Sequence, residues 1–364
     1  MSQSVKQNSK LKLLVSMNHT MDPAGFFVYL EFVINGILYC NLYNNIYAPI
    51  PEVIFDEYEY CRKRLNNKGD QPQNNFLSKI KNPYFEKKYG DNMWDYFFYM
   101  KKENDPNEQC ILYNPFKLID NSCLQFTSDH KPNCQCISSF HGMSPRPARE
   151  FWLCIHNGDK HIPNIKTYPR GSEYSLCRLY GKEYTPNIHR WYSNNRSLAN
   201  KTINEYIGIK QFVLDNVNNI WSKFFDPTDY VIGIHVRGTD KVWGGKKIVP
   251  NDYIPFIDKI SSKNKNAKIF LATDDPDYIQ PIIEKYGDIV KYTDAQRDKE
   301  NIFLSDKGSN YHKGLDVLTD SLLLSKCNFL IKSSSAVSEF AIYFNIDLHN
   351  NSINLQYDCS NLIN

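Results

Sequence analysis

The chain has 364 residues, of which 41% are hydrophobic, and its 43 Lys and Arg residues nearly balance 40 Asp and Glu residues to give a formal charge of +3. This length exceeds the size at which one hydrophobic core stops growing, so it predicts two domains rather than a single small module. A charge so close to neutral is not typical of a nucleic-acid-binding protein, and we expect no nucleic-acid partner.

The first 12 residues are polar and lack the apolar run of roughly 7–15 residues that a secretory signal needs. No stretch of the sequence approaches the roughly 18 apolar residues required to cross a bilayer. We therefore expect a cytoplasmic protein without a transmembrane segment. In a reducing compartment, most of the ten cysteines are expected to be small buried hydrophobic residues and not disulfides.

The beginning of the chain predicts a strand, a loop, a helix and a second strand. An apolar run at 10–16 indicates a buried strand, and the Pro- and Gly-containing segment 21–25 indicates a loop. Apolar residues recur every three or four positions over 26–43, which predicts a helix with one buried stripe. The next strand is expected at 46–51, and this order is typical of α/β proteins.

Residues 56–200 show no clear period, because polar loops, prolines and aromatic residues interrupt it. We expect long insertions into the first domain over this region. A helical pattern returns at 202–225, where apolar residues again recur at three and four positions.

A cluster of possible metal ligands also lies in the middle region, consisting of Cys110, Cys123, His130, Cys134, Cys136 and His141. Their spacing fits no common zinc pattern. We therefore expect no bound metal, and a metal site is the alternative.

Strands and helices alternate regularly from residue 229 onward. The strands are expected at 230–236, 267–272, 289–292 and 328–331, and the helices at 251–262, 276–286, about 314–325 and from 335. Such alternation predicts a parallel sheet with helices on both faces. Because ligands of such sheets bind beyond the carboxyl ends of the strands, the residues that follow each strand are the candidates for a site.

Polar residues follow three of these strands, at 235–241, 273–276 and 333–335. Arg237 offers a planar fork of donors that can bind two phosphate oxygens and that stays charged near neutral pH. Gly238 allows a close approach of the backbone, and Lys241 adds a mobile positive charge. The serines at 333–335 lie where a helix begins, and their hydroxyls and the free N–H groups of that helix form an anion site.

A purely structural interpretation of these residues is the alternative. Arg237 and Asp240 would then form an ion pair, and the serines at 333–335 would only cap a helix. We favour function for Arg237, because an arginine beside His, Asp and Lys at a strand end is more than capping requires.

Three ordered blocks, at 235–241, 271–276 and 320–335, resemble the donor-binding half of the α-1,6-fucosyltransferase and nodulation fucosyltransferase family, whose superfamily includes the protein O-fucosyltransferases. The resemblance extends over roughly 230–343, with a weaker similarity at 25–49. It implies a GT-B-like α/β fold of two Rossmann-like domains with parallel sheets. Residues 1–205 would be the acceptor-side domain with long insertions, and residues 206–364 the nucleotide-sugar-binding domain.

The resemblance also implies an activity. The enzyme would transfer fucose from GDP-fucose to a hydroxyl of a glycan or glycoconjugate, with inversion at the anomeric carbon and without a metal or other cofactor. Its partners would be the nucleotide-sugar donor and that acceptor. Asp274 and Asp275 could be drawn as a metal-binding pair, but a nucleotide-binding or structural role is expected in a metal-independent family.

The roles carried over by the resemblance are as follows. Arg237 would bind the β-phosphate and stabilise the charge that develops as GDP leaves. His235 and Asp320 would face the guanine, Ser334 and Ser335 would contact phosphate, and Gly25 would approach the diphosphate from the other domain. The expected donor-binding residues are Gly25, His235, Arg237, Gly238, Asp274, Asp275, Asp320, Ser333, Ser334 and Ser335, and the expected catalytic residues are Arg237, Asp240 and Lys241.

This chain departs from the family pattern at two places. The family has a second arginine at the position of Gly238, and a catalytic glutamate shortly after the lysine, where this chain has the segment 243–246. No general base is therefore evident. Asp240 is the first candidate, followed by Asp275 or an N-terminal residue, and little base assistance is needed if bond breaking runs ahead of attack.

Two other functions are kept as alternatives. The same site could bind a different nucleotide-sugar donor. The chain could also be a non-catalytic GT-B-fold protein that binds glycans or partners, for which the missing glutamate after Lys241 is the best support.

Overall fold

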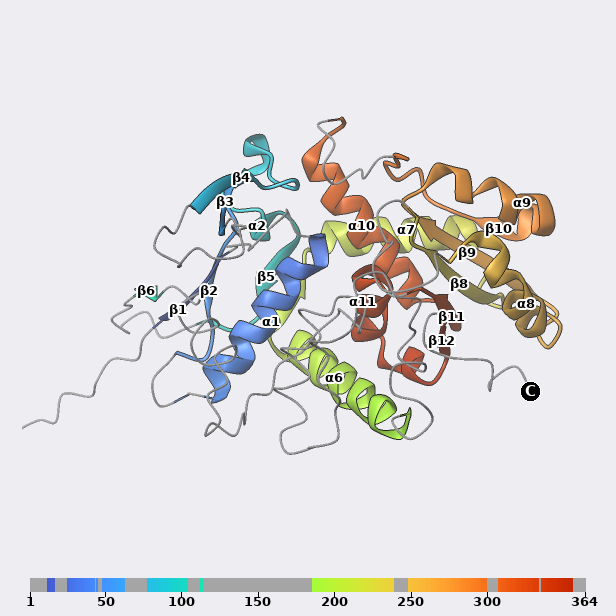
Figure 1. Cartoon of the computed structure of the whole chain (residues 1–364), viewed down its shortest axis with the longest axis horizontal. Coiled ribbons are helices and arrows are strands. Elements are labelled where there is room, and N and C mark those ends of the chain that lie inside the picture. Colours follow the sequence, from blue (N-terminus) through green and yellow to red (C-terminus); the bar gives the residue numbers. More distant parts are fainter. Residues whose placement is uncertain are drawn as a thin grey trace, which may run out of the picture.

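The structure, a computed structural model, describes residues 12–16, 25–42, 44, 48–62, 77–103, 112–113, 185–238, 248–299, 307–333 and 335–355. These residues form a mixed α/β structure in which helices pack around parallel strands (Figure 1). None of the helices in these ranges has both the length and the apolar character needed to cross a membrane.

A five-stranded parallel sheet occupies the C-terminal part of the chain. Its strands are β8 (Tyr230–Val236), β9 (Ala267–Thr273), β10 (Val290–Lys291), β11 (Phe329–Lys332) and β12 (Ser352–Asn354), in the order β10-β9-β8-β11-β12. All neighbouring strands are parallel. The predicted parallel sheet is confirmed, and β12 is an additional edge strand that was not predicted.

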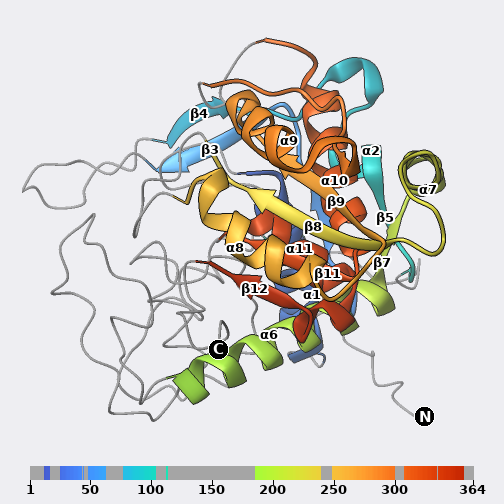
Figure 2. The same cartoon turned by 90° about the vertical axis from the view of Figure 1, so that its right-hand side faces the viewer.

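Helices cover both faces of this sheet, as predicted (Figure 2). One face packs against α8 (Pro250–Ser261) and α9 (Gln280–Tyr286), and the other against α7 (Gln211–Phe224), α10 (Asn310–Ser325) and α11 (Ala336–Phe344). The side chains of β8 alternate between the two faces of the sheet, which explains this arrangement. Ile232 and Ile234 pack into the core on the side of α8 and α9, and Val231 packs into the core on the opposite side. Short 3-10 helices connect these elements: η5 (Pro276–Tyr278), η6 (Gly287–Ile289) and η7 (Ile346–His349).

The N-terminal part contains a smaller parallel sheet in the order β2-β1-β6, formed by β1 (Lys12–Ser16), β2 (Glu52–Ile54) and β6 (Leu112–Tyr113). The helix after β1 is α1 (Phe26–Leu42). Both elements were predicted. The second strand was placed too early, at 46–51, because Pro49 and Pro51 have no N–H to donate to a ladder, and pairing begins only after them.

Two antiparallel pairs complete the described strands. The first joins β3 (Tyr58–Arg62) to β4 (Leu77–Lys81). The second joins β5 (Phe98–Met100) to β7 (Ile207–Ile209), although more than one hundred residues separate them in the sequence. The short helices η1 (Lys87–Tyr89) and α2 (Trp94–Phe97) precede β5.

The prediction of a single helix at 202–225 is wrong. Helix α6 (Thr185–Tyr206) ends where β7 begins, and α7 starts only at Gln211. At the interruption, residues 207–209 pair with the distant strand β5. Glycine is needed at 208 in this pair, because a Cβ atom there would lie 2.2 Å from Cζ of Tyr99 on the paired strand. The apolar residues of β7 therefore serve a strand, although their spacing also suits a helix.

The two parts of the chain share one hydrophobic core. Helix α1 packs against α6 and α11, and the rings of Phe27 and Phe340 are stacked with their centroids 4.6 Å apart. Helix α6 itself runs through the expected boundary at residue 205. The division into domains at 1–205 and 206–364, and with it the two-domain GT-B arrangement, stays a prediction.

Candidate active site

The carboxyl ends of three strands lie side by side at one edge of the large sheet. His235 on β8 pairs with Ala272 on β9 and with Lys332 on β11, so the strands end at the same level. Strand order also reverses here, because β9 and β10 extend from β8 in one direction and β11 and β12 in the other. Ligands of open parallel sheets bind in the crevice at such a reversal.

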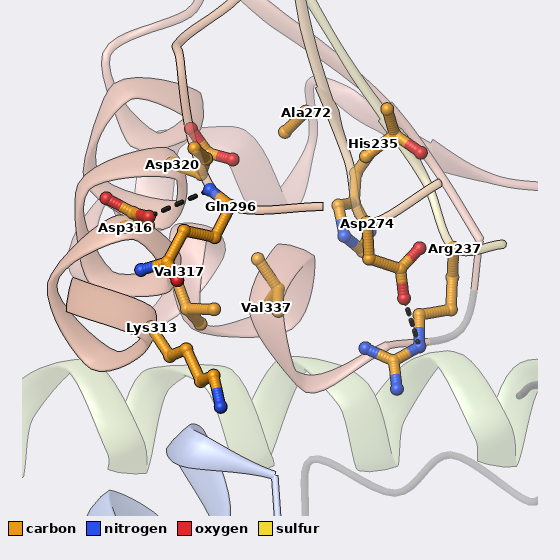
Figure 3. A pocket seen from close by; sticks show the side chains of 12 residues that line it. His235, Arg237, Ala272, Asp274, Gln296, Lys313, Asp316, Val317, Asp320 and Val337 are labelled. Carbon is orange, nitrogen blue, oxygen red and sulfur yellow. Dashed lines mark hydrogen bonds and ion pairs between the residues drawn. The ribbon is translucent and has the colours of Figure 1, made fainter. Parts of the chain in front are cut away.

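A pocket opens at this reversal (Figure 3). It is lined by residues at the ends of β8 and β9, by the loop at 295–296, by one side of α10 and by Val337 of α11. Four of the predicted donor-binding residues line it: His235, Arg237, Asp274 and Asp320. The pocket thus brings together residues from five separate stretches of sequence.

Asp274 holds the Arg237 side chain in place. Its Oδ2 atom lies 3.3 Å from Nε of Arg237, and its Oδ1 atom accepts a hydrogen bond from the Gly238 backbone N–H at 2.7 Å. The side chains of Arg237 and Asp274 are only 13% and 11% exposed. The ion pair involves Nε, on the side of the guanidinium away from the planar fork of terminal nitrogens, and it fixes the orientation of that fork.

Gly238 is required by the position of its neighbour Asp275. A Cβ atom at residue 238 would lie 2.4 Å from Cβ of Asp275, which is far closer than atoms can approach. Asp275 is buried and its Oδ1 accepts a hydrogen bond from the Asp277 backbone N–H at 3.0 Å, which caps η5. The arginine that the α-1,6-fucosyltransferase family has at this position therefore could not fit beside Asp275 without rearrangement.

His235 and Ser333 are linked through the backbone at the ends of β8 and β11. The carbonyl oxygen of His235 accepts hydrogen bonds from the Tyr253 hydroxyl at 2.7 Å and from the Ser333 N–H at 3.3 Å. The hydroxyl of Ser333 in turn accepts from the Arg237 N–H at 3.4 Å. These contacts hold the backbone of the two strand ends together, with the His235 side chain turned toward the pocket (Figure 3).

Asp320 lies at the buried end of the pocket. Its side chain is 7% exposed, and Oδ1 accepts a hydrogen bond from the Thr293 hydroxyl at 2.7 Å. Burial raises the pKa of Asp320 to about 7, and the nearby charge of Asp316 acts in the same direction. The positive charge of Arg297 and the Thr293 hydrogen bond oppose this rise.

Arg297 organises the loop that faces Asp320. Its guanidinium donates hydrogen bonds to the backbone carbonyls of Thr273, Thr293 and Ala295, at 3.0, 2.9 and 2.9 Å. This loop carries Gln296 into the pocket wall. Arg297 is therefore occupied with backbone groups, and it influences Asp320 through its charge and not through a direct bond.

Three polar residues of α10 and its neighbouring loop that line the pocket were not predicted from the sequence, namely Gln296, Lys313 and Asp316. Lys313 is 2% exposed, and its Nζ lies 3.2 Å from Oδ1 of Asn310. Asp316 Oδ2 accepts from the Gln296 N–H at 2.9 Å. The available signal was the spacing of Lys313, Asp316 and Asp320, which places three charged residues on one side of a largely apolar helix.

The remaining predicted residues have the following positions. Ser335 is the N-cap residue of α11, and Gly25 is exposed just before α1; neither lines the pocket. Asp240, Lys241 and Ser334 lie outside the residues that the structure describes. Their roles, including that of Asp240 as general base, stay predictions.

A buried cluster of charges lies between the end of β11, α11 and α6. Glu339 on α11 accepts hydrogen bonds from Arg196 of α6, with Nε at 2.7 Å and Nη2 at 3.1 Å, and from Nζ of Lys332 at 2.7 Å. Glu339 and Lys332 are fully buried. The ion pair between Lys332 and Glu339 thus connects the end of β11 to α11.

Among the described residues, no group of three or more His, Cys, Asp or Glu side chains has the arrangement of a metal site. The possible ligands at Cys110, Cys123, His130, Cys134, Cys136 and His141 lie outside the described ranges. The expectation that this chain binds no metal therefore stays a prediction.

No family model matches this chain, and no curated protein is similar to it in sequence. Its structure is similar to that of the fucosyltransferase NodZ from Bradyrhizobium, with a TM-score of 0.41, 13% identity, and 92% and 93% of the two chains covered. A GDP complex of a mutant of FUT1 from Arabidopsis thaliana gives a TM-score of 0.41 at 12% identity, covering 93% of this chain and 70% of that one.

A GDP complex of POFUT1 gives a TM-score of 0.37 at 8% identity, covering 96% and 99% of the two chains. These proteins belong to the fucosyltransferase superfamily that the sequence resembles. Likenesses of this size assign no roles to the residues of this chain.

Proposed function

We propose that this chain is an inverting, metal-independent glycosyltransferase that transfers fucose from GDP-fucose to a hydroxyl group of a glycan or glycoconjugate. The observation that carries the proposal is the pair formed by Arg237 and Asp274 at the strand ends, across a pocket from the buried carboxyl group of Asp320. One end of the pocket suits a phosphate group and the other suits a base that donates hydrogen bonds.

Asp320 supports the choice of guanine. An ionised carboxylate has only acceptors, and guanine presents two adjacent donors, the ring N–H and the exocyclic amine. Adenine and uracil each combine a donor with acceptors on the corresponding edge and would leave a carboxylate oxygen without a donor. Since Asp320 is buried, an unsatisfied oxygen there is costly, which favours guanine over the other two bases.

Arg237 supports phosphate binding and catalysis. Its guanidinium is fixed by Asp274, and its backbone N–H is held by Ser333, so little reorganisation is needed when a phosphate group binds. A charge that is oriented before the reaction stabilises the negative charge that develops on the leaving diphosphate. In a metal-independent enzyme this arginine takes the part that a divalent cation has elsewhere.

The proposed reaction is a single displacement at the anomeric carbon of fucose. The acceptor oxygen attacks from the face opposite the diphosphate, the bond from that carbon to the β-phosphate oxygen breaks, and GDP leaves with the bonding electrons. The acceptor hydroxyl loses its proton to a base, for which Asp240 remains the first candidate. The configuration at the anomeric carbon is thereby inverted.

Calorimetry with GDP, UDP and ADP tests the donor. We expect GDP to bind at least about tenfold more tightly than UDP or ADP, since the difference between a satisfied and an unsatisfied buried carboxylate is on the order of 1–3 kcal/mol. Equal affinities would support another nucleotide-sugar donor, and no binding of any of the three would contradict a glycosyltransferase site.

Activity is tested by the release of GDP from GDP-fucose in the presence of a panel of glycan acceptors. Replacement of Arg237 by Ala should reduce kcat by about 100- to 1000-fold, the effect of removing one preorganised group that stabilises developing charge. Lys326→Ala is the matched control, because Lys326 is an exposed cation at the far end of α10 and should not affect the rate. A wild-type protein that binds GDP but releases none from GDP-fucose would indicate the non-catalytic alternative.

A further inference from the structure

Helix α10 presents a row of charged side chains to the pocket. Lys313, Asp316 and Asp320 all line it, together with Val317, and they follow one another at intervals of three and four residues. Side chains with this spacing lie on the same side of a helix, one above another. The rest of the described helix is mostly buried and apolar, so these charges are not part of a solvated surface.

The row has a direction along the helix axis. With a rise of about 1.5 Å per residue, Asp316 lies about 6 Å along α10 from Asp320, and Lys313 lies about 5 Å further. Figure 3 shows Asp320 and His235 toward one end of the pocket and Lys313 and Arg237 toward the other. The two cations therefore share one end, and Asp316 lies between that end and Asp320.

A nucleoside diphosphate has the same order of groups, with base, ribose and phosphates in sequence. If Asp320 contacts the base and Arg237 the phosphates, the group opposite Asp316 is the ribose. On the basis of the proposed function, we propose that Asp316 binds the ribose hydroxyls of the donor nucleotide and makes the enzyme selective for ribonucleotides.

The chemistry of Asp316 fits this role. The Gln296 N–H donates to its Oδ2 at 2.9 Å, which orients the carboxylate. A carboxylate has about four acceptor positions, so this bond leaves positions for two adjacent hydroxyl groups. Burial raises the pKa of Asp316, which indicates a poorly hydrated carboxylate that gains from new donors.

The competing explanation is that Asp316 only holds the loop at Gln296 against α10. Asp316→Asn separates the two roles, because an amide oxygen still accepts from the Gln296 N–H but the side chain no longer offers acceptors to two hydroxyl groups. A purely structural aspartate would change the affinities for all nucleotides by the same factor.

The test is calorimetry of wild-type protein and Asp316→Asn with GDP, 2′-deoxy-GDP and 3′-deoxy-GDP. We expect the wild type to bind GDP about tenfold or more tightly than either deoxy analogue, and the variant to bind all three within about a factor of two. Asp320→Asn is the matched control one turn along the same helix. It should weaken the binding of all three nucleotides equally and keep the wild-type ratio.

Two results would overturn the inference. One is a wild-type protein that binds GDP and both deoxy analogues equally, a measurement that needs no variant. The other is a wild-type ratio retained in Asp316→Asn. In both cases GDP still binds, so the proposed function would stand, whereas a wild-type protein that binds no GDP would overturn both.

Discussion

Asp320 on α10 and Glu339 on α11 are both buried carboxyl groups, but their surroundings differ. Glu339 is fully buried and lies 2.7 Å from both Arg196 Nε and Lys332 Nζ. Asp320 is bonded by the neutral Thr293 hydroxyl and lines a pocket. Arg297, whose positive charge lowers the pKa of Asp320, donates its hydrogen bonds to backbone carbonyls.

The difference separates a structural carboxylate from a ligand-binding one. Removing a carboxylate from water is costly, and bonds to two cations offset that cost within the protein at Glu339. At Asp320 the cost is only partly offset, which is why its pKa rises to about 7. A buried group that remains under-compensated beside a pocket is a candidate for binding a ligand with donors.

Glu339→Gln is expected to have the largest effect on stability. The substitution leaves the buried Arg196 and Lys332 without their carboxylate, and such a loss destabilises proteins by about 3–5 kcal/mol. Urea unfolding measures the change. The control is Glu205→Gln, which removes an exposed ion pair with Lys102 and should leave the unfolding midpoint nearly unchanged. An equally small effect at Glu339 would show that burial and pairing do not distinguish these carboxylates.

Asp320→Asn tests, through the pH dependence of stability, whether the buried carboxyl group of Asp320 lacks compensating charges. Because the pKa of Asp320 is raised in the folded protein, the folded state binds more protons than the unfolded state between the ordinary value of 3.8 and about 7. Stability should therefore fall by a few kcal/mol as the pH rises through this window, and Asp320→Asn should lack this decline. Thermal or urea unfolding from pH 4 to 8 measures it, and parallel curves for the two proteins would contradict an uncompensated carboxyl group.

Glu86 is a third carboxylate in this series, and its hydrogen bonds connect the N-terminal part of the chain to the start of α10. It accepts hydrogen bonds from the Ser309 hydroxyl and from the Tyr311 N–H, the latter at 3.2 Å, and it pairs with Lys88 at 2.6 Å. Partial burial raises the pKa of Glu86, but the bonds from Lys88, Ser309 and Tyr311 outweigh this and lower it to about 2. It is thus a compensated carboxylate at a partly exposed position.

Glu86→Gln is expected to have the smallest effect, a loss of about 1 kcal/mol, similar to the loss of a helix cap. Because the pKa is lowered, the contribution is complete above the ordinary value of 4.5 and disappears as the pH falls toward about 2. Comparison of unfolding at pH 7 and pH 3 measures this, with Glu284→Gln on the exposed side of α9 as the control. A loss as large at pH 3 as at pH 7 would contradict the assignment.

The local sequence pattern was sufficient to predict the strands that surround the site. The apolar runs that form β8, β9 and β11 are visible in the sequence, and the alternation with helices predicts that they are parallel. Once the strands are placed, Arg237 and Asp274 follow as residues at neighbouring strand ends. Both were identified because each lies within one or two residues of a strand that can be recognised alone.

Long-range contacts determined what the sequence pattern missed. Lys313 and Asp316 could not be assigned to the pocket until the orientation of α10 against the sheet was known. The break between α6 and α7 coincides with the pairing of β7 with β5, more than one hundred residues earlier.

The sequence by itself determined the parallel sheet, its strand ends and the presence of Arg237 at one of them, because these follow from hydrophobic periodicity over a few residues. Only the tertiary structure decided which charges are neutralised. Glu339 pairs with Arg196 at a separation of 143 residues, whereas Asp320 accepts its hydrogen bond within the described part of the chain from the neutral hydroxyl of Thr293. The physical reason is that the energy of a buried charge depends on all neighbours in space, and periodicity does not contain that information.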